Sequence, residues 1–247
     1  MKMKTSVVIP ARWNSERLRG KMLADLNGKP VLWHTWERVK KMRHCDELII
    51  ATDYEGIYDE VKKWGGKVVM TDEKWRSGTE RAASIIEQLE GDFILLVQGD
   101  ECFINVELLD RLVVTGEKSS YDIITPVCSI KNKEALMNPN VVKAVVAQGG
   151  RVLYFSRLPV PYIRGREGVE ATLHWQHIGV YGYKRAVLEK FFSIPVSPLE
   201  EAEKLEQLRF LEAGYTIMTL EEKGTNLDIN TLEDLECARK MPMEVIV

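Results

Sequence analysis

The sequence lacks the segments that would carry it into a membrane or out of the cell. It has no apolar run near the roughly 20 residues that a transmembrane helix needs, and the run Val7–Ile9 is short and ends at Pro10. The four cysteines are widely spaced, with no C-x-x-C interval and no tight Cys/His cluster, which disfavours zinc sites and disulfide frameworks. We therefore expect no signal peptide and a cytoplasmic protein with free thiols.

The sequence also lacks a strong excess of either charge. Its formal net charge is -3, whereas nucleic-acid-binding proteins usually present a strongly basic face. We therefore predict no nucleic-acid partner and no membrane insertion. A balance of 45% hydrophobic and 29% charged residues over 247 residues predicts a folded globular chain. A few arginines gathered in one cleft can still bind a small anion at this net charge.

Strands alternate with helices through the first half of the chain. Short β-branched runs and helical periodicity predict strands at 5–9, 47–52, 67–70 and 92–97, and helices at 31–42, 56–64 and 79–89. This alternation predicts an α/β fold with a mostly parallel central sheet. Ligands bind such sheets beyond the carboxyl ends of the strands, where the chain carries polar loops at Ala11–Lys21, Thr71–Arg81 and Gln98–Glu101.

The second half of the chain is richer in strand patterns. Strands are predicted at 123–130, 141–147, 152–155, 178–183 and 216–220, and helices at 200–213 and 232–240. Gly214 stands where a glycine often ends a helix. We therefore expect a smaller β-rich lobe that belongs to the same domain.

The loop after the first predicted strand is strongly basic. It contains Arg12, Arg17, Arg19 and Lys21, and it is neither a Walker A loop nor a G-x-G-x-x-G loop. Arginine binds phosphate at two points and lysine supplies a compact charge, so the loop suits a nucleotide triphosphate. A solvated basic surface loop is the alternative.

Other polar residues admit two interpretations each. Asp100 follows a predicted strand, where a carboxylate binds magnesium or caps the next turn. His177 has no metal-spaced partner, so a hydrogen-bonded structural role competes with ligand binding. Glu206 and Gln207 lie on the polar side of a predicted helix, which is usually a solvated side.

A series of motifs resembles those of one enzyme family along nearly the whole chain. In chain order they are Val8-Ile9-Pro10-Ala11-Arg12, Ser15-x-Arg17-Leu18-x-Gly20-Lys21, Asn27-Gly28-Lys29-Pro30, Ala51-Thr52-Asp53, Ser77-Gly78-Thr79-Glu80-Arg81, Val97-Gln98-Gly99-Asp100-Glu101, Asn138-Pro139-Asn140-Val141-Val142-Lys143, Leu153-Tyr154-Phe155-Ser156-Arg157, His177-Ile178-Gly179-Val180-Tyr181-Gly182-Tyr183, Ser197-Pro198-Leu199-Glu200, Leu205-Glu206-Gln207-Leu208-Arg209 and Thr231-Leu232-Glu233-Asp234-Leu235. The family is that of the 3-deoxy-manno-octulosonate (Kdo) cytidylyltransferases.

The resemblance implies a Rossmann-like α/β nucleotidyltransferase fold, a homodimer, and Mg²⁺ as cofactor. It implies transfer of CMP from CTP to the anomeric hydroxyl of Kdo, with release of pyrophosphate, for lipopolysaccharide synthesis. It also implies one domain over residues 1–247, with a CTP-binding part at 1–120, a sugar-binding and dimerisation part at 121–220, and a closing strand and helix at 221–247.

The family's site residues carry over as follows. The triphosphate is held by Arg12, Arg17 and Lys21. The cytidine is surrounded by Ala11, Arg76, Ser77, Gly78 and Gln98. The sugar acid meets Arg157, His177, Tyr181, Glu206 and Gln207. The catalytic magnesium is held by Asp100 and by a second position in the segment that contains Asp228 and Asn230.

Four positions depart from the family pattern. Arg19 and Cys102 each replace a usual proline, and Gln176 replaces a usual basic residue. Asn230 stands at the family's second metal-binding aspartate and carries no negative charge. Asp228 points to the same side as Asn230 if the segment is extended, so we hypothesise that Asp228 supplies or supports the second carboxylate.

These departures leave other functions open. The sugar could be the 8-amino analogue of Kdo or another 2-keto sugar acid of the sialic-acid type. A CTP-binding homologue without catalysis is a further alternative, which Asn230 keeps open.

Overall fold

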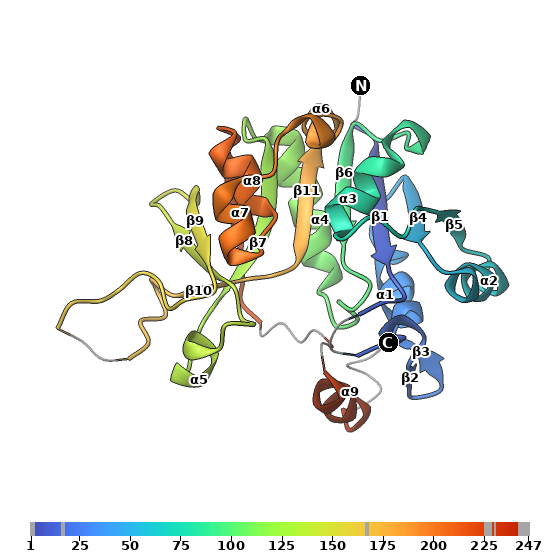
Figure 1. Ribbon diagram of the computed structural model, residues 1–247, viewed down its shortest axis with the longest axis horizontal. Coiled ribbons are helices and arrows are strands. Elements are labelled where there is room, and N and C mark those ends of the chain that lie inside the picture. The colour runs from blue at the N-terminus through green and yellow to red at the C-terminus, as the bar shows by residue number, and fades with distance from the viewer. Residues whose placement is uncertain (1–2, 16–17, 166–167, 225–228, 230, 242–247) are drawn as a thin grey trace.

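One mixed sheet runs through both halves of the chain (Figure 1). The computed structural model describes residues 3–15, 18–165, 168–224, 229 and 231–241. Within these residues, ten strands join in the order β5-β4-β1-β6-β11-β7-β10-β8-β9, and β12 pairs with β7. The strands are β1 (Thr5–Ala11), β4 (Glu47–Thr52), β5 (Lys67–Met70), β6 (Phe93–Val97), β7 (Ile123–Ser129), β8 (Lys143–Val146), β9 (Val152–Ser156), β10 (Trp175–His177), β11 (Val180–Lys184) and β12 (Ile217–Glu222), with a separate hairpin of β2 (Asp25–Leu26) and β3 (Lys29–Pro30).

The predicted α/β fold with a mostly parallel central sheet is confirmed. Strands β5, β4, β1 and β6 are all parallel, and β11 then pairs with both β6 and β7 in the antiparallel sense. The β-rich lobe of the second half consists of β7, β8, β9 and β10, which are antiparallel neighbours. The carboxyl ends of β1, β4 and β6 therefore lie along one edge of the sheet.

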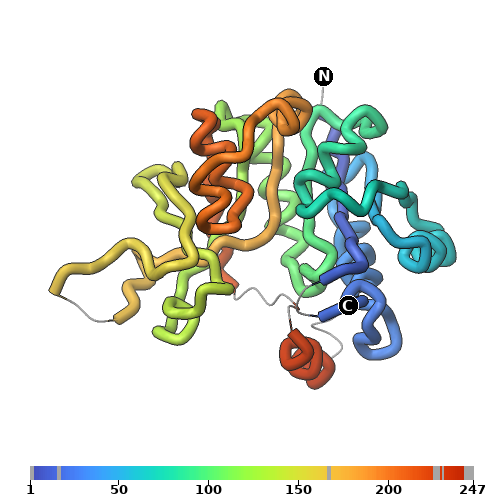
Figure 2. The backbone as a smooth tube through the Cα atoms, in the orientation of Figure 1, coloured from blue at the N-terminus to red at the C-terminus, as the bar shows by residue number. Residues whose placement is uncertain are grey.

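Helices cover both faces of the sheet, as the backbone trace also shows (Figure 2). They are α1 (Val31–Val39), α2 (Glu55–Lys63), α3 (Gly78–Ser84), α4 (Val106–Lys118), α5 (Lys133–Met137), α6 (Arg185–Leu188), α7 (Pro198–Glu203), α8 (Gln207–Glu212) and α9 (Leu232–Arg239), with 3-10 turns at Lys21–Leu23, Ile86–Gln88 and Phe191–Ser193. In β1, Val7 and Ile9 pack with helices α1 and α4, whereas Val8 packs on the opposite side with α3. This alternation buries the central strand on both faces.

Most of the predicted strands and helices are present with close bounds, including the strand predicted at 178–183, and the differences are the following. The helix predicted at 79–89 ends at Ser84 and continues as a 3-10 turn. The helix predicted at 200–213 is two helices, α7 and α8, because Lys204 adopts a left-handed conformation with φ 53°. The strand predicted at 178–183 is β11, and the short strand β10 precedes it.

Two further observations bear on the composition. None of the helices in the described part of the chain is long and apolar enough to span a membrane. All four cysteines are free, as predicted, with Cys102 and Cys128 buried and Cys237 exposed.

Candidate functional site

The residues predicted to surround a cytidine converge at the carboxyl ends of β1 and β6. Ala11 is the last residue of β1, and Gln98 follows β6 directly. A Cβ atom on Gly78 would lie 2.6 Å from Gln98 Nε2 and 3.0 Å from Pro10 Cγ. The amino end of α3 therefore lies close to both strand ends, and a larger residue at position 78 would displace the Gln98 side chain.

Ser77 begins α3 and links two parts of the site. Its Oγ accepts a hydrogen bond from the backbone N–H of Glu80, 3.0 Å away, and so caps the helix. The same hydroxyl donates to Glu206 Oε2. The loop before α3 is thereby joined to the start of α8, which comes from the far end of the chain.

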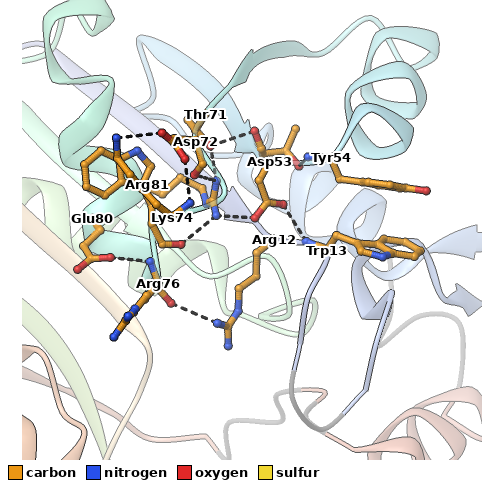
Figure 3. A network of polar contacts seen from close by, with 12 residues as sticks. Arg12, Trp13, Asp53, Tyr54, Thr71, Asp72, Lys74, Arg76, Glu80 and Arg81 are labelled. Carbon is orange, nitrogen blue, oxygen red and sulfur yellow. Dashed lines mark hydrogen bonds and ion pairs between the residues drawn. The ribbon is translucent and has the colours of Figure 1, made fainter.

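Arg12 and Arg76 lie on opposite sides of a cleft of about 520 Å³. Arg12 Nη1 donates a hydrogen bond to the carbonyl oxygen of Arg76 at 3.2 Å (Figure 3). Both arginines are exposed, so their remaining N–H donors are available to an anion. The aromatic rings of Trp13, Tyr54 and Trp75 line the same cleft.

Lys21 forms an ion pair with Asp100 just beyond the end of β6. Lys21 is only 5% exposed and sits in the 3-10 turn after the first loop. The neighbouring carbonyl of Gly99 accepts a hydrogen bond from Thr35 Oγ1 at 2.8 Å. These contacts fix the Asp100 carboxylate and the Lys21 ammonium group together in the middle of the site.

Of the residues predicted to contact the sugar acid, His177 and Tyr181 lie with their rings in contact. Their centroids are 5.0 Å apart, and His177 Nε2 is 2.9 Å from Thr125 Oγ1. Burial lowers the pKa of His177 to about 3. Burial, followed by the nearby Tyr183 and Glu206 groups, raises the pKa of Tyr181 above its usual value. Both rings are therefore neutral hydrogen-bonding groups around pH 7.

Glu206 and Gln207 do not lie on a solvated helix side, as the pattern alone suggested. Gln207 is buried, and Glu206 is half-buried against Ser77. Burial raises the pKa of Glu206 to about 7, although its hydrogen bonds from Ser77 and Thr79 lower it. The carboxyl group therefore titrates near neutrality.

Arg157 donates hydrogen bonds to backbone carbonyls at the break between α7 and α8. Its Nε donates to the carbonyl of Glu203 at 2.7 Å, and its Nη2 donates to the carbonyl of Lys204 at 3.2 Å. Its Nη1 donates to the carbonyl of Pro139 at 3.0 Å. The buried Lys143 donates to the Arg157 carbonyl at 2.6 Å. Most of the guanidinium donors of Arg157 are thus engaged with backbone carbonyls.

Three predicted site residues, Arg17, Asp228 and Asn230, lie outside the described residues. Ile229 is described, and its backbone N–H lies 3.4 Å from the Asp100 carbonyl oxygen to which it donates. Across the part of the chain that is described, no three His, Cys, Asp or Glu side chains gather as metal ligands. The carboxylate of Asp100 is nevertheless a hard oxygen donor of the kind that magnesium prefers.

Comparison with known proteins places this geometry in a family. The profile of the cytidylyltransferase family, described as "Cytidylyltransferase", matches residues 6–222. A 3-deoxy-manno-octulosonate cytidylyltransferase of Chlorobaculum tepidum is 41% identical over 97% of this chain and 97% of its own. The chain belongs to the Kdo cytidylyltransferase family. A relative of the same name from Thermodesulfovibrio yellowstonii is 39% identical over 96% of this chain and 98% of its own.

A solved structure of a Kdo cytidylyltransferase supports the same placement. The CMP:2-keto-3-deoxy-manno-octonic acid synthetase complexed with CTP matches with a TM-score of 0.88 and 36% identity. The match covers 96% of this chain and 97% of that one. A glucose-1-phosphate thymidylyltransferase from Bacillus anthracis, at 15% identity and a TM-score of 0.68 over 96% of both chains, shares the fold.

One departure from the Kdo cytidylyltransferase pattern, Cys102, lies in the core of the described residues. Cys102 is fully buried and packs in one apolar cluster with Ile229, the residue before Asn230. Backbone hydrogen bonds from Glu101 to Gln98 and from Ile104 to Glu101 hold the turn that contains Cys102. The turn is thus fixed without the usual proline. Arg19 is exposed, and Gln176 is half-buried on β10.

The structure adds residues that the sequence interpretation left without a role. Asp53 and Arg81 form a buried ion pair of 2.7 Å behind the first loop, and Lys143 is fully buried at the edge of the sugar side. Both Asp53 and Arg81 stand in the quoted motifs. The sequence signal that could have revealed them is a charged residue next to a buried strand or on the buried side of a helix, because such residues are buried only when they are paired.

Proposed function

We propose that this chain transfers CMP from CTP to the anomeric hydroxyl of Kdo, giving CMP-Kdo and pyrophosphate for lipopolysaccharide synthesis in the cytoplasm. The observation that carries the proposal is the Ser77–Glu206 hydrogen bond. It joins the predicted cytidine side to the predicted sugar side, so the two substrates would meet next to the Lys21–Asp100 pair. A single-step transfer needs this kind of juxtaposition.

On the nucleotide side, exposed arginines would bind the triphosphate and strand ends would hold the base. Arg12 and Arg17 supply guanidinium groups and Lys21 supplies an ammonium group beside the reacting phosphate. Ala11, Arg76, Ser77, Gly78 and Gln98 would enclose the cytidine. Positive charge held in place before the reaction stabilises the charge that develops as pyrophosphate leaves.

Asp100 would hold a magnesium ion, with Asp228 or Asn230 from the segment around Ile229. The fit rests on the hard carboxylate of Asp100 and on the contact between Ile229 and the Asp100 backbone. When bound, magnesium would neutralise phosphate charge. The ion pair with Lys21 keeps the Asp100 carboxylate in position for this role.

On the sugar side, Arg157, His177, Tyr181, Glu206 and Gln207 would contact the sugar acid. His177 and Tyr181 are neutral near pH 7, so they suit hydroxyl groups rather than the carboxylate. Arg157 carries the positive charge for the carboxylate, although backbone carbonyls already engage most of its donors.

A substrate panel tests the function. The protein is incubated with CTP, magnesium, and either Kdo, 8-amino-Kdo or a sialic acid, and pyrophosphate release is followed. The proposal expects the highest kcat/KM with Kdo. Preference for 8-amino-Kdo or sialic acid would redirect it to that sugar, and CTP binding without turnover on any sugar would favour a non-catalytic homologue. Asp228→Ala with unchanged rate and magnesium dependence would refute the role of Asp228.

We also propose that the chain acts as a homodimer. The described residues between β9 and β10, 157–165 and 168–174, reach away from the sheet (Figures 1 and 2) and expose apolar side chains, with Leu158 68% and Tyr162 86% exposed. Such exposed apolar residues are typical of protein interfaces. Light scattering after size exclusion should give twice the chain mass, and Tyr162→Glu should shift it towards the monomer. A monomeric wild-type chain would contradict the proposal.

A further inference from the structure

A buried arginine stands behind both loops of the proposed nucleotide side. Arg81 lies on α3 and is 1% exposed, which makes it one of the most buried large side chains in the described residues. Its Nη2 pairs with Asp53 Oδ2 at 2.7 Å, where β4 ends. Since buried arginines are rare unless paired, this one has a specific structural task.

The second and third contacts of Arg81 hold the loop between β5 and α3. Its Nη2 also donates to the carbonyl of Trp75 at 3.2 Å, and its Nη1 donates to Thr71 Oγ1. Trp75 is followed directly by Arg76 and Ser77, which belong to the proposed cytidine side. Figure 3 shows Arg81 at the centre of these contacts.

The partner Asp53 holds the first loop through its other oxygen. Asp53 Oδ1 accepts the backbone N–H of Trp13 at 3.0 Å. Trp13 adjoins Arg12, its carbonyl accepts the N–H of Gly20 at 3.2 Å, and its ring stacks on Tyr54 at 4.2 Å. One carboxylate therefore connects the base of the proposed triphosphate loop to Arg81.

We propose that the Asp53–Arg81 pair is a positioning device that sets the distance between the two CTP-binding loops. The pair touches no reacting group; it acts on Arg12 through Trp13 and on Arg76 through Trp75. A buried ion pair adds little net stability compared with apolar residues of similar size, so its placement between two ligand loops points to geometry. This proposal rests on the CTP-binding roles proposed above for Arg12 and Arg76.

The test uses two substitutions at Asp53 in the full chain. Asp53→Asn would keep an oxygen that accepts the Trp13 N–H, but the amide NH2 group that would face Arg81 cannot accept a hydrogen bond. Asp53→Ala would remove both contacts. We expect Asp53→Ala to raise the KM and the Kd of CTP roughly 10- to 100-fold, and Asp53→Asn to raise them less, with a smaller change in kcat at saturating CTP.

A matched control separates positioning from loss of stability. Glu47 and Lys67, the first residues of β4 and β5, form an ion pair at the end of these strands that lies away from Asp53. Glu47 also accepts a hydrogen bond from Ser6 Oγ at 2.6 Å. Glu47→Gln should lower the unfolding midpoint and leave the KM of CTP unchanged. If Glu47→Gln and Asp53→Asn raised the KM of CTP alike, the effect would be one of general stability and the proposal would be wrong.

Arg12→Ala distinguishes a failure of the proposed CTP-binding site from a failure of the positioning role of Asp53 and Arg81. If Arg12→Ala leaves the KM of CTP unchanged, the assigned nucleotide side is wrong. If Arg12→Ala raises the KM of CTP but both Asp53 variants bind CTP like the wild type, only the positioning proposal is overturned. Where Asp53→Ala does not fold, Asp53→Asn and Arg81→Lys decide, because Arg81→Lys keeps the charge and loses the contact with Trp75.

Discussion

At the scale of single residues, burial makes Glu206 a group that titrates near neutrality. Burial raises its pKa from 4.5 to about 7, while the unfolded chain binds and releases that proton near the lower value. Between these two values the unfolded state alone loses the proton as pH rises, so Glu206 makes the folded state progressively less stable.

We therefore predict that Glu206→Gln changes the pH dependence of stability. Below about pH 4.5 the carboxyl group is protonated in both states and the substitution should have a small effect. Above pH 7 the variant should gain about 1–3 kcal/mol of unfolding free energy relative to its difference at low pH. Urea unfolding of both proteins at several pH values measures this. Parallel curves for the two proteins would refute the raised pKa.

At the scale of elements, the break between α7 and α8 is the main difference from the predicted pattern. The residues from 200 to 213 favour one helix, with Leu205, Leu208 and Leu211 on one side. The break lies at the left-handed Lys204, and Arg157, the residue after β9, donates hydrogen bonds to the carbonyls of Glu203 and Lys204 there.

The left-handed Lys204 gives a prediction about this break. Glycine adopts φ of about +53° without strain, whereas a β-branched residue does not. Lys204→Gly should keep or raise the unfolding free energy by up to about 1 kcal/mol, and Lys204→Val should lower it by about 1–2 kcal/mol. Lys190→Gly, at an exposed residue with φ -85°, is the control and should be destabilising. Equal losses for both glycine variants would contradict the local strain.

Helix α4 packs on the sheet through a close contact at Gly116. A Cβ atom there would overlap the ring of Phe93, and so would a Cβ atom on Gly182 of β11. Alanine favours helices over glycine by about 1 kcal/mol, but overpacking a core costs about 1–3 kcal/mol. Since the contact is so short, the steric cost should dominate.

Gly116→Ala should therefore lower the free energy of unfolding by up to about 2 kcal/mol, the overpacking cost less the gain in helix propensity. Phe93→Leu creates room, so the double variant Gly116→Ala/Phe93→Leu should be more stable than the sum of the two single changes predicts. Denaturant midpoints of all four proteins give the coupling energy. Additive effects would show that the helix shifts instead.

What the sequence predicts well in this protein is local in origin. Strands β1, β4 and β5 follow from short β-branched runs, and the meeting of polar loops at their carboxyl ends follows from parallel pairing. Strand β10 was not predicted, because the short Trp175–His177 segment forms a strand only through its pairing with β7 and β8. The task of Asp53 was not predicted either, since it depends on an arginine 28 positions away.

At the scale of the whole molecule, the continuous sheet predicts one cooperative unfolding transition. Strand β1 of the first half and strand β7 of the second half belong to one sheet, joined through β6 and β11. CTP should therefore stabilise the entire chain: at 100 times its Kd it adds about 2.7 kcal/mol to the unfolding free energy, or about 5–10 °C in Tm for a chain of this size. Calorimetry with and without CTP measures this, and two separate transitions would show that the halves unfold independently.

The position of β12 also affects how the chain is made. Strands β1, β4, β5 and β6 all lie within residues 5–97, so a ribosome releases them before the second half exists. Strand β7 follows, but β12, its parallel partner, emerges only after β8, β9, β10 and β11. Until then β7 presents one bare edge, which is the kind of surface on which growing chains aggregate. Of the strands in the described residues, the one synthesised last is the one that closes this edge.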